Sequence, residues 1–145
     1  MKLEVRNIRL TGVVVCTLCL CALFGCKDKN KPDSRYGEVE KPSWTIPSDY
    51  DYTSSMTAII RVDSMESSAD DVLAAFSGEK CYGIAEYKDG LFYLYIAGGG
   101  ESTVMLKLWS AHYKNIFVSS PIPYENDLLL GTVAAPYVPV FTVSK

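Results

Sequence analysis

The residues that could form a nucleophile–base pair in the part of the sequence after residue 26 are one cysteine and one histidine. His112 is the only histidine of the 145-residue chain, and Cys81 is the last of its five cysteines. A cysteine nucleophile needs a nearby base, so a Cys81–His112 pair is the single candidate dyad. The alternative is that Cys81 is a small apolar core residue beside Gly83 and Ala85. Because the Gly-x-Ser-x-Gly motif of serine hydrolases is also absent, we expect a protein that is not an enzyme.

Four acidic residues crowd one connection and could offer carboxylates to a metal ion: Asp63, Glu66, Asp70 and Asp71. Calcium takes oxygen ligands of this kind, but the spacing does not match an EF-hand loop. A solvated acidic loop is the simpler interpretation, so we expect no metal site and no cofactor. Residues 98–100 are all glycine but are not followed by Gly-Lys-Ser/Thr, so we expect a turn and not a phosphate cradle.

Aromatic side chains are the strongest hint of a binding function. All ten tyrosines lie after residue 25. Tyr93 and Tyr95 share one face of an expected strand, and Trp109 shares a face of the next strand with Lys107. Flat rings on a sheet can stack on sugars or anchor a protein partner, so Tyr93, Tyr95 and Trp109 form a candidate ligand platform. The alternative is that these rings cover half-buried sheet faces, because aromatic residues are favoured in strands.

Residues 1–25 have the layout of a cleaved secretory leader. Lys2, Arg6 and Arg9 precede an apolar or small run at residues 10–24. This run is shorter than the roughly 20 residues that a helix needs to cross a bilayer. An uncleaved membrane anchor and a conventionally secreted protein are the two alternatives.

The end of this segment, Leu23-Phe24-Gly25-Cys26, resembles the bacterial lipobox. The resemblance implies that a diacylglycerol is attached to the sulfur of Cys26, that cleavage occurs before Cys26, and that the new amino group is acylated. Phe24 departs from the pattern, which prefers a smaller residue. One acyl chain binds a membrane only reversibly, whereas three would hold the protein essentially permanently.

Residues 26–43 are expected to be the lipidated cysteine and a flexible tether, because charged and polar residues predominate there. Lys27-Asp28 resembles the surface-export signal of Bacteroidota lipoproteins, which implies a lipid anchor in the outer membrane with the domain facing the cell surface. Without the leader, the formal charge is about −5. This charge disfavours nucleic-acid binding. The expected partners are the membrane and either a glycan or an envelope protein.

Residues 44–145 are predicted to form one all-β domain. Strand-forming runs recur at a spacing of about 8–12 residues, with turn residues between them and no long helical period. We predict an antiparallel β-sandwich of about seven or eight short strands, with a partly open β-barrel as the alternative. The expected strands lie at residues 55–62, 71–76, 81–87, 91–97, 103–110, 115–118, 128–133 and 138–143. The run at 71–76 could also be a helical turn.

Residues 71–85 resemble a recurring module of Bacteroidota surface proteins. The resemblance rests on Asp71, the Ala75-Phe76 pair, a Gly78-Glu79 turn and a Cys-x-Gly-x-Ala pattern from Cys81. Two departures are Tyr82, where the family often has arginine, and Lys80, which precedes the cysteine. The resemblance implies a sandwich-like fold at the cell surface and no particular activity.

Ser64 is a candidate modification site. Asp63-Ser64-Met65 resembles the acceptor for O-glycosylation in Bacteroidota, although an unmodified loop serine is the alternative. With the leader and the tether, these features predict a lipoprotein that displays a non-enzymatic β-sandwich for binding or adhesion, with a glycan as a candidate ligand. The alternative function is a structural or assembly subunit that docks to other envelope proteins through a sheet edge.

Overall fold

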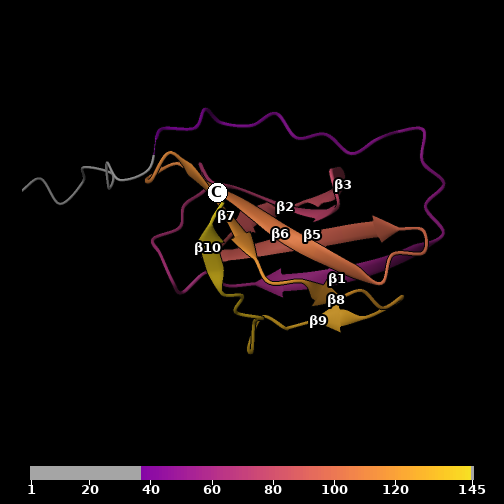
Figure 1. Ribbon diagram of the computed structural model, residues 1–145. Helices are drawn as coiled ribbons and strands as arrows, with labels where there is room; N and C mark the ends of the chain where they lie inside the picture. Colours follow the sequence, from indigo (N-terminus) through magenta and orange to yellow (C-terminus); the bar gives the residue numbers. More distant parts are fainter. Residues whose placement is uncertain (1–36, 145) are drawn as a thin grey trace, which may run out of the picture. The chain divides into compact units, whose positions relative to one another are not determined.

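The structure, a computed structural model, describes residues 37–144 (Figure 1). The described residues form strands, turns and irregular segments without a helix, so the predicted all-β class is confirmed. The strands are β1 (Ser54–Ile60), β2 (Val72–Ser77), β3 (Lys80–Ile84), β4 (Glu86–Lys88), β5 (Leu91–Gly98), β6 (Thr103–Ser110), β7 (Asn115–Ser119), β8 (Ile122–Pro123), β9 (Leu129–Leu130) and β10 (Phe141–Val143). Within these residues no helix is long and apolar enough to cross a membrane.

The strands form two sheets, which we call sheet A and sheet B. Sheet A has the order β4-β5-β1-β9, and sheet B has the order β10-β7-β6-β2-β3, with β8 paired to β6. All pairs of named strands are antiparallel except β1 with β9. Neither sheet closes into a barrel, so the sandwich is confirmed over its alternative.

The core lies between the two sheets and is made by alternate residues of the long strands. Successive side chains of a strand point to opposite faces, so every second residue reaches the core. The largest fully buried core side chains are Phe92, Met56, Ile60, Leu73, Leu94, Ile96, Leu106, Leu108 and Val104. Burying one such side chain contributes about 1.5–3 kcal/mol, so this core is what holds the two sheets together.

The expected strand at residues 81–87 is wrong in one respect, because the chain changes sheets within it. β3 belongs to sheet B and β4 to sheet A, and Ala85 lies between them. The Ala85 amide donates to the Leu73 carbonyl at the corner. Gly83 lets β3 approach β5 closely, since a Cβ there would come within 2.2 Å of the Tyr95 carbonyl oxygen. Sequence alternation continues through this corner and therefore does not reveal it.

The remaining strands follow the sequence with shifted ends. The Asp89-Gly90 hairpin between β4 and β5 is confirmed, and both residues have positive φ, 52° and 81°. Residues 71–76 are a strand and not a helical turn. β8 is an additional short strand, which pairs with β6 through Ile122. β9 and β10 are two and three residues long, much shorter than expected, and each pairs with a strand distant in sequence, β1 and β7 respectively.

Residues 37–47, which we call the cover segment, have no regular secondary structure but are bonded to sheet B (Figure 1, indigo). The Val39 amide donates to the Lys114 carbonyl at 2.7 Å, and the Asn115 side chain donates to the Gly37 carbonyl at 3.1 Å. Trp44 packs edge-on against Phe76, with ring centroids 5.2 Å apart. The chain thus contacts the domain from Gly37 onward, whereas the sequence predicted that the tether extends to residue 43 and the domain begins at residue 44.

Candidate functional site

The outer face of sheet A, which we call face A, carries two of the three candidate platform residues. Its outward positions are Ser55, Thr57 and Ile59 on β1 and Tyr93, Tyr95 and Ala97 on β5, which pair across the two strands. Tyr95 is 60% exposed, whereas Tyr93 is half-buried. The prediction that Tyr93 and Tyr95 share a face is confirmed, but only Tyr95 offers a broadly open ring.

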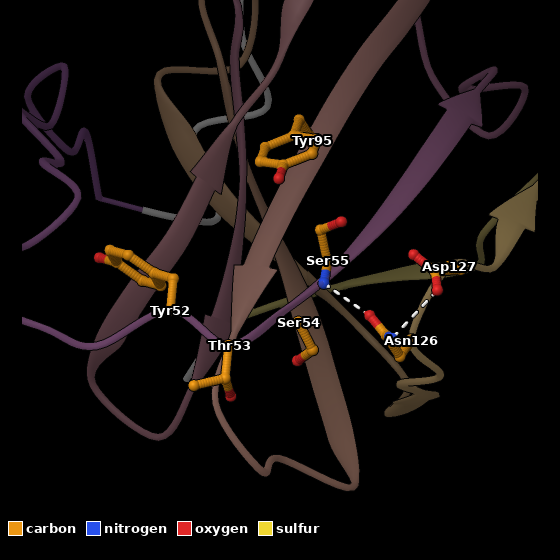
Figure 2. A pocket seen from close by; sticks show the side chains of 7 residues that line it. All are labelled: Tyr52, Thr53, Ser54, Ser55, Tyr95, Asn126 and Asp127. Atoms are coloured by element: carbon orange, nitrogen blue, oxygen red, sulfur yellow. Dashed lines mark hydrogen bonds between the residues drawn. The ribbon is translucent and has the colours of Figure 1, made fainter.

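A shallow hollow of about 300 Å³ lies beside Tyr95 (Figure 2). Its lining is Tyr95, the chain leading into β1, and the loop before β9: Tyr52, Thr53, Ser54, Ser55, Tyr95, Asn126 and Asp127. Ser55 pairs with Ala97, so small side chains stand next to Tyr95 on both strands and leave room beside its ring. Figure 2 shows Ser55 between the Tyr95 ring and the Asn126–Asp127 pair.

Hydrogen bonds fasten the loop of this hollow to the start of β1. The Ser55 amide donates to Asn126 Oδ1 at 2.9 Å, and the Asp127 amide donates to the Ser55 carbonyl at 2.8 Å. Asn126 Nδ2 donates to Asp127 Oδ2 at 3.1 Å. Asp127 has a φ of 59°, a conformation that aspartate and asparagine adopt more readily than most residues. The two side chains are therefore held in place before any ligand arrives.

The hollow is polar and carries an uncompensated carboxylate. In residues 37–144 the ion pairs are Arg61–Asp63 and Lys107–Glu79, and neither includes Asp127. The Ser54 hydroxyl is already bonded to the Tyr124 hydroxyl at 2.9 Å, whereas the hydroxyls of Thr53 and Ser55 make no hydrogen bond within residues 37–144. Nothing in the sequence singles out Asn126 or Asp127, because their position depends on a loop that returns from the other sheet.

A cluster of tyrosines around Glu101 packs against one residue that lines the hollow, Tyr52. Tyr52, which lines the hollow, packs against Tyr50 with ring centroids 5.1 Å apart. The Tyr50 hydroxyl donates to Glu101 Oε1 at 3.0 Å, and the Gly99 amide donates to Oε2 at 2.6 Å. Burial alone would raise the pKa of the Glu101 carboxyl, but hydrogen bonds from Tyr82, Gly99 and Tyr50 outweigh it and lower that pKa to about 2. This carboxylate is a fixed structural acceptor.

Trp109, the third platform residue, has to be removed from the platform. It points outward from β6 as expected, but it lies on the outer face of sheet B and is 4% exposed. Its indole N–H donates to the Val39 carbonyl at 2.9 Å, and the Lys41 and Lys114 ammonium groups lie 5.7 and 5.3 Å from its ring centroid. The cover segment occupies the surface that a ligand would need.

The Cys81–His112 dyad is excluded by the fold. Cys81 is buried with Ala74, Phe76 and Trp44, and burial raises the pKa of its thiol. It pairs with Phe76, which pairs with Met105 near the start of β6. His112 follows the far end of that strand, so at about 3.3 Å per residue the two side chains stand more than roughly 15 Å apart. The alternative, a packed thiol, is correct.

The acidic connection is divided among separate structural contacts. Asp63 binds the guanidinium of Arg61 at 2.6 Å, and hydrogen bonding to that group lowers the pKa of its carboxyl. Asp71 is buried and accepts from the amides of Ser68 and Ala111 at 2.9 and 2.7 Å. Within the described residues no three histidine, cysteine or acidic side chains are grouped to hold a metal ion.

The two candidate modification sites are Ser64 and Cys26. Ser64 is exposed at a bend after β1, where a hydroxyl is accessible. Cys26, the leader and the first part of the tether lie outside the described residues.

Searches of protein-family models, of curated proteins and of solved structures gave no match to this chain.

Proposed function

We propose that this protein is a lipoprotein of the bacterial outer membrane that displays a non-enzymatic β-sandwich as a binding module, with a glycan as its favoured ligand. The observation that carries the proposal is the exposed Tyr95 ring beside a polar hollow on face A. Ligand sites are concave and combine apolar or aromatic surface with a few fixed polar groups. The hollow has both components.

The anchoring part of the proposal is supported by sequence. Leu23-Phe24-Gly25-Cys26 closes a short apolar run and is followed at once by charged residues. Lipidation at Cys26 would place the domain at the membrane surface at the end of the tether. Lys27-Asp28 resembles the surface-export signal of Bacteroidota lipoproteins, which would place the anchor in the outer leaflet of the outer membrane, with the membrane itself as the partner.

The non-catalytic part is supported by the state of the reactive side chains. Cys81 is buried apart from His112, and the Glu101 carboxylate is already engaged by hydrogen bonds. A general base needs to lie within hydrogen-bond reach of a reacting proton, and neither group opens onto the Tyr95 hollow. The carboxylate that does line the hollow, Asp127, has no histidine, cysteine or second carboxylate beside it among the lining residues, so the hollow offers contacts and hydrogen bonds.

Metabolic labelling tests the anchor. Cells expressing the full chain are grown with labelled palmitate, and we expect label on the wild-type protein but not on a Cys26→Ala variant. Protease added to intact cells should then remove the domain if it faces outward. An unlabelled, freely soluble wild-type protein would contradict the proposal.

A glycan array tests the binding function. The full chain is purified in a zwitterionic detergent, because detergents with sugar head groups would compete. We expect signals with the wild type that are lost in Tyr95→Ala and kept in Tyr113→Ala, a control tyrosine in the turn between β6 and β7 that does not line the hollow. Equal signals from the wild type and Tyr95→Ala would remove face A as the site.

The alternative, an assembly subunit of the envelope, is favoured by a different surface. The segment around β9 exposes several aliphatic side chains: Leu129, Val133, Val138 and Val140. Exposed apolar residues that gather in one segment are typical of protein-binding surfaces. Crosslinking in intact cells followed by mass spectrometry would favour this function if one envelope protein were recovered in stoichiometric amount.

A further inference from the structure

The walls of the Tyr95 hollow differ in chemistry. One wall is the exposed ring of Tyr95, whose π face attracts weakly positive C–H groups. The opposite wall is the amide and carboxylate of Asn126 and Asp127, with Ser55 between them (Figure 2). A ligand that fits both walls has one apolar C–H face and polar groups at its edge. A sugar ring has this combination.

The polar wall has one donor and one acceptor left over. Asn126 Nδ2 carries two hydrogens and gives one of them to Asp127 Oδ2, so the second hydrogen remains. Asp127 Oδ1 accepts no hydrogen bond from the described residues, whereas Oδ2 is used. A donor and an acceptor that are hydrogen-bonded to each other present a pair matched to two neighbouring hydroxyl groups, one accepting and one donating.

The residues that line the hollow include one negatively charged side chain, Asp127, and no positively charged one. Asp127 has no cationic partner in the part of the chain that the structure describes. The side chains that line the hollow beside it are neutral: three with aliphatic hydroxyls, two tyrosines and an asparagine. A sugar carboxylate or sulfate placed there would meet a like charge without a compensating donor cation, which is unfavourable.

The size of the hollow limits the ligand to a short segment. A volume of about 300 Å³ is at the lower end of the roughly 300–1,000 Å³ that small-molecule sites occupy. One ring of a longer chain can sit in it while the rest extends over face A, where Thr57 is exposed opposite Tyr95.

We propose that the hollow binds one ring of a neutral saccharide, with Tyr95 stacking on the ring and the Asn126–Asp127 pair recognising two neighbouring hydroxyls. This inference rests on the proposed binding function and adds a ligand class and the residues that determine specificity. An ammonium ligand would also suit an aromatic ring and a carboxylate. The hollow favours the saccharide because hydroxyls and an amide offer donors as well as acceptors, and an ammonium group uses acceptors alone.

Isothermal titration calorimetry of the full chain in zwitterionic detergent tests this inference. The probes are the neutral glycan that scores highest on the array, the same glycan with its terminal sugar oxidised to the uronic acid, and glucosamine. We expect the neutral glycan to bind and the uronate to bind at least about tenfold more weakly, a difference of about 1.4 kcal/mol.

Two variants assign the roles of the walls. Tyr95→Ala should weaken binding of the neutral glycan about tenfold, whereas Tyr113→Ala, in the turn between β6 and β7 and outside the lining of the hollow, should change it by less than about twofold. Asp127→Asn keeps the shape of the side chain and tolerates its positive φ. It should weaken neutral binding and reduce the ratio between neutral and acidic ligands to about threefold or less, a shift that loss of folding would not produce.

The outcomes separate this inference from the broader function. Equal affinity of the wild type for the neutral glycan and the uronate, or an unchanged ratio in Asp127→Asn, would overturn the inference while glycan binding stood. Binding of glucosamine alone would assign the hollow to ammonium ligands and overturn it too. Absence of any signal on the array would overturn the glycan function itself, and the inference with it.

Discussion

The two outer faces of the sandwich start from similar residues and end in opposite states. Trp109 and Tyr95 are aromatic residues at outward positions of the two longest strands, β6 and β5. Trp109 is 4% exposed and Tyr95 is 60% exposed. The cover segment lies on the first ring and not on the second. Exposure, and not aromatic character, therefore identifies the candidate binding residue.

The neighbours of each ring explain why only one face is covered. The outer face of sheet B, which we call face B, carries on β2 and β3 a buried apolar cluster of Ala74, Phe76 and Cys81, and Trp44 of the cover segment packs against this cluster. Leaving such a surface in water would be unfavourable. Face A has Ser55 and Thr57 beside Tyr95, and these hydroxyls are readily hydrated. Four predictions test this contrast, in order of expected effect.

Replacing Trp109 by alanine should have the largest effect on stability. The change removes a buried ring and the hydrogen bond from its indole to the Val39 carbonyl. We expect the free energy of unfolding to fall by about 3–5 kcal/mol, measured by urea denaturation followed by circular dichroism. A loss below about 1 kcal/mol would mean that the cover segment does not bury face B in solution.

Replacing Trp44 by alanine should open face B without removing part of the sheet. We expect a loss of about 2 kcal/mol, because Trp44 is half-buried against Phe76. Cys81 should also become more reactive, since burial raises the pKa of its thiol in the wild type. Alkylation by iodoacetamide, followed by mass spectrometry of the Cys81 peptide, measures this. Tyr95→Ala is the control on face A and should leave alkylation unchanged.

Replacing Glu101 by glutamine should change the pH dependence of stability. The folded-state pKa of Glu101 is about 2, below its ordinary value of 4.5, so the unfolded chain binds its proton more readily. The stabilisation is therefore present above about pH 4.5 and is lost as the pH falls towards 2. We expect a difference of about 1 kcal/mol at pH 7, because solvent screens this partly exposed group. Denaturation curves of both proteins at several pH values measure it, and a difference independent of pH would contradict the assignment.

Replacing Tyr95 by alanine should have the smallest effect on stability. Its ring is mostly in water, so we expect the free energy of unfolding to change by less than about 0.5 kcal/mol. Urea denaturation beside the Trp109→Ala variant measures the contrast directly. Similar losses in both variants would show that the two faces do not differ as described.

The sequence predicted most of the sheet residues because alternation is a local property. Val104, Leu106 and Leu108 are buried and Thr103 is exposed, as their spacing requires. The Asp89-Gly90 turn was also predictable, since positive φ is a property of the residues themselves. Sheet membership was not predictable at Ala85, because a strand that changes sheets keeps its alternation.

The candidate site was predictable only at Tyr93 and Tyr95. Asn126 and Asp127 belong to no recognisable sequence motif. They line the hollow because the backbone amide and carbonyl of Ser55 form hydrogen bonds with their loop. Trp109 was wrong as a platform residue because the segment that covers it has the composition of a tether. The cover segment contacts face B through backbone groups and the side chains of Lys41 and Trp44, and a polar composition does not predict these contacts.

By itself the sequence determined the all-β class, the alternation that separates core from surface, and the hairpin turns, because these depend on neighbours along the chain. The tertiary structure alone decided which outward aromatic ring is exposed, where the chain crosses between sheets, and which loop completes the hollow. These features depend on contacts between segments that are distant in sequence. On face B, the burial of apolar residues favours packing of the cover segment, and this packing leaves Trp109 buried while Tyr95 stays exposed.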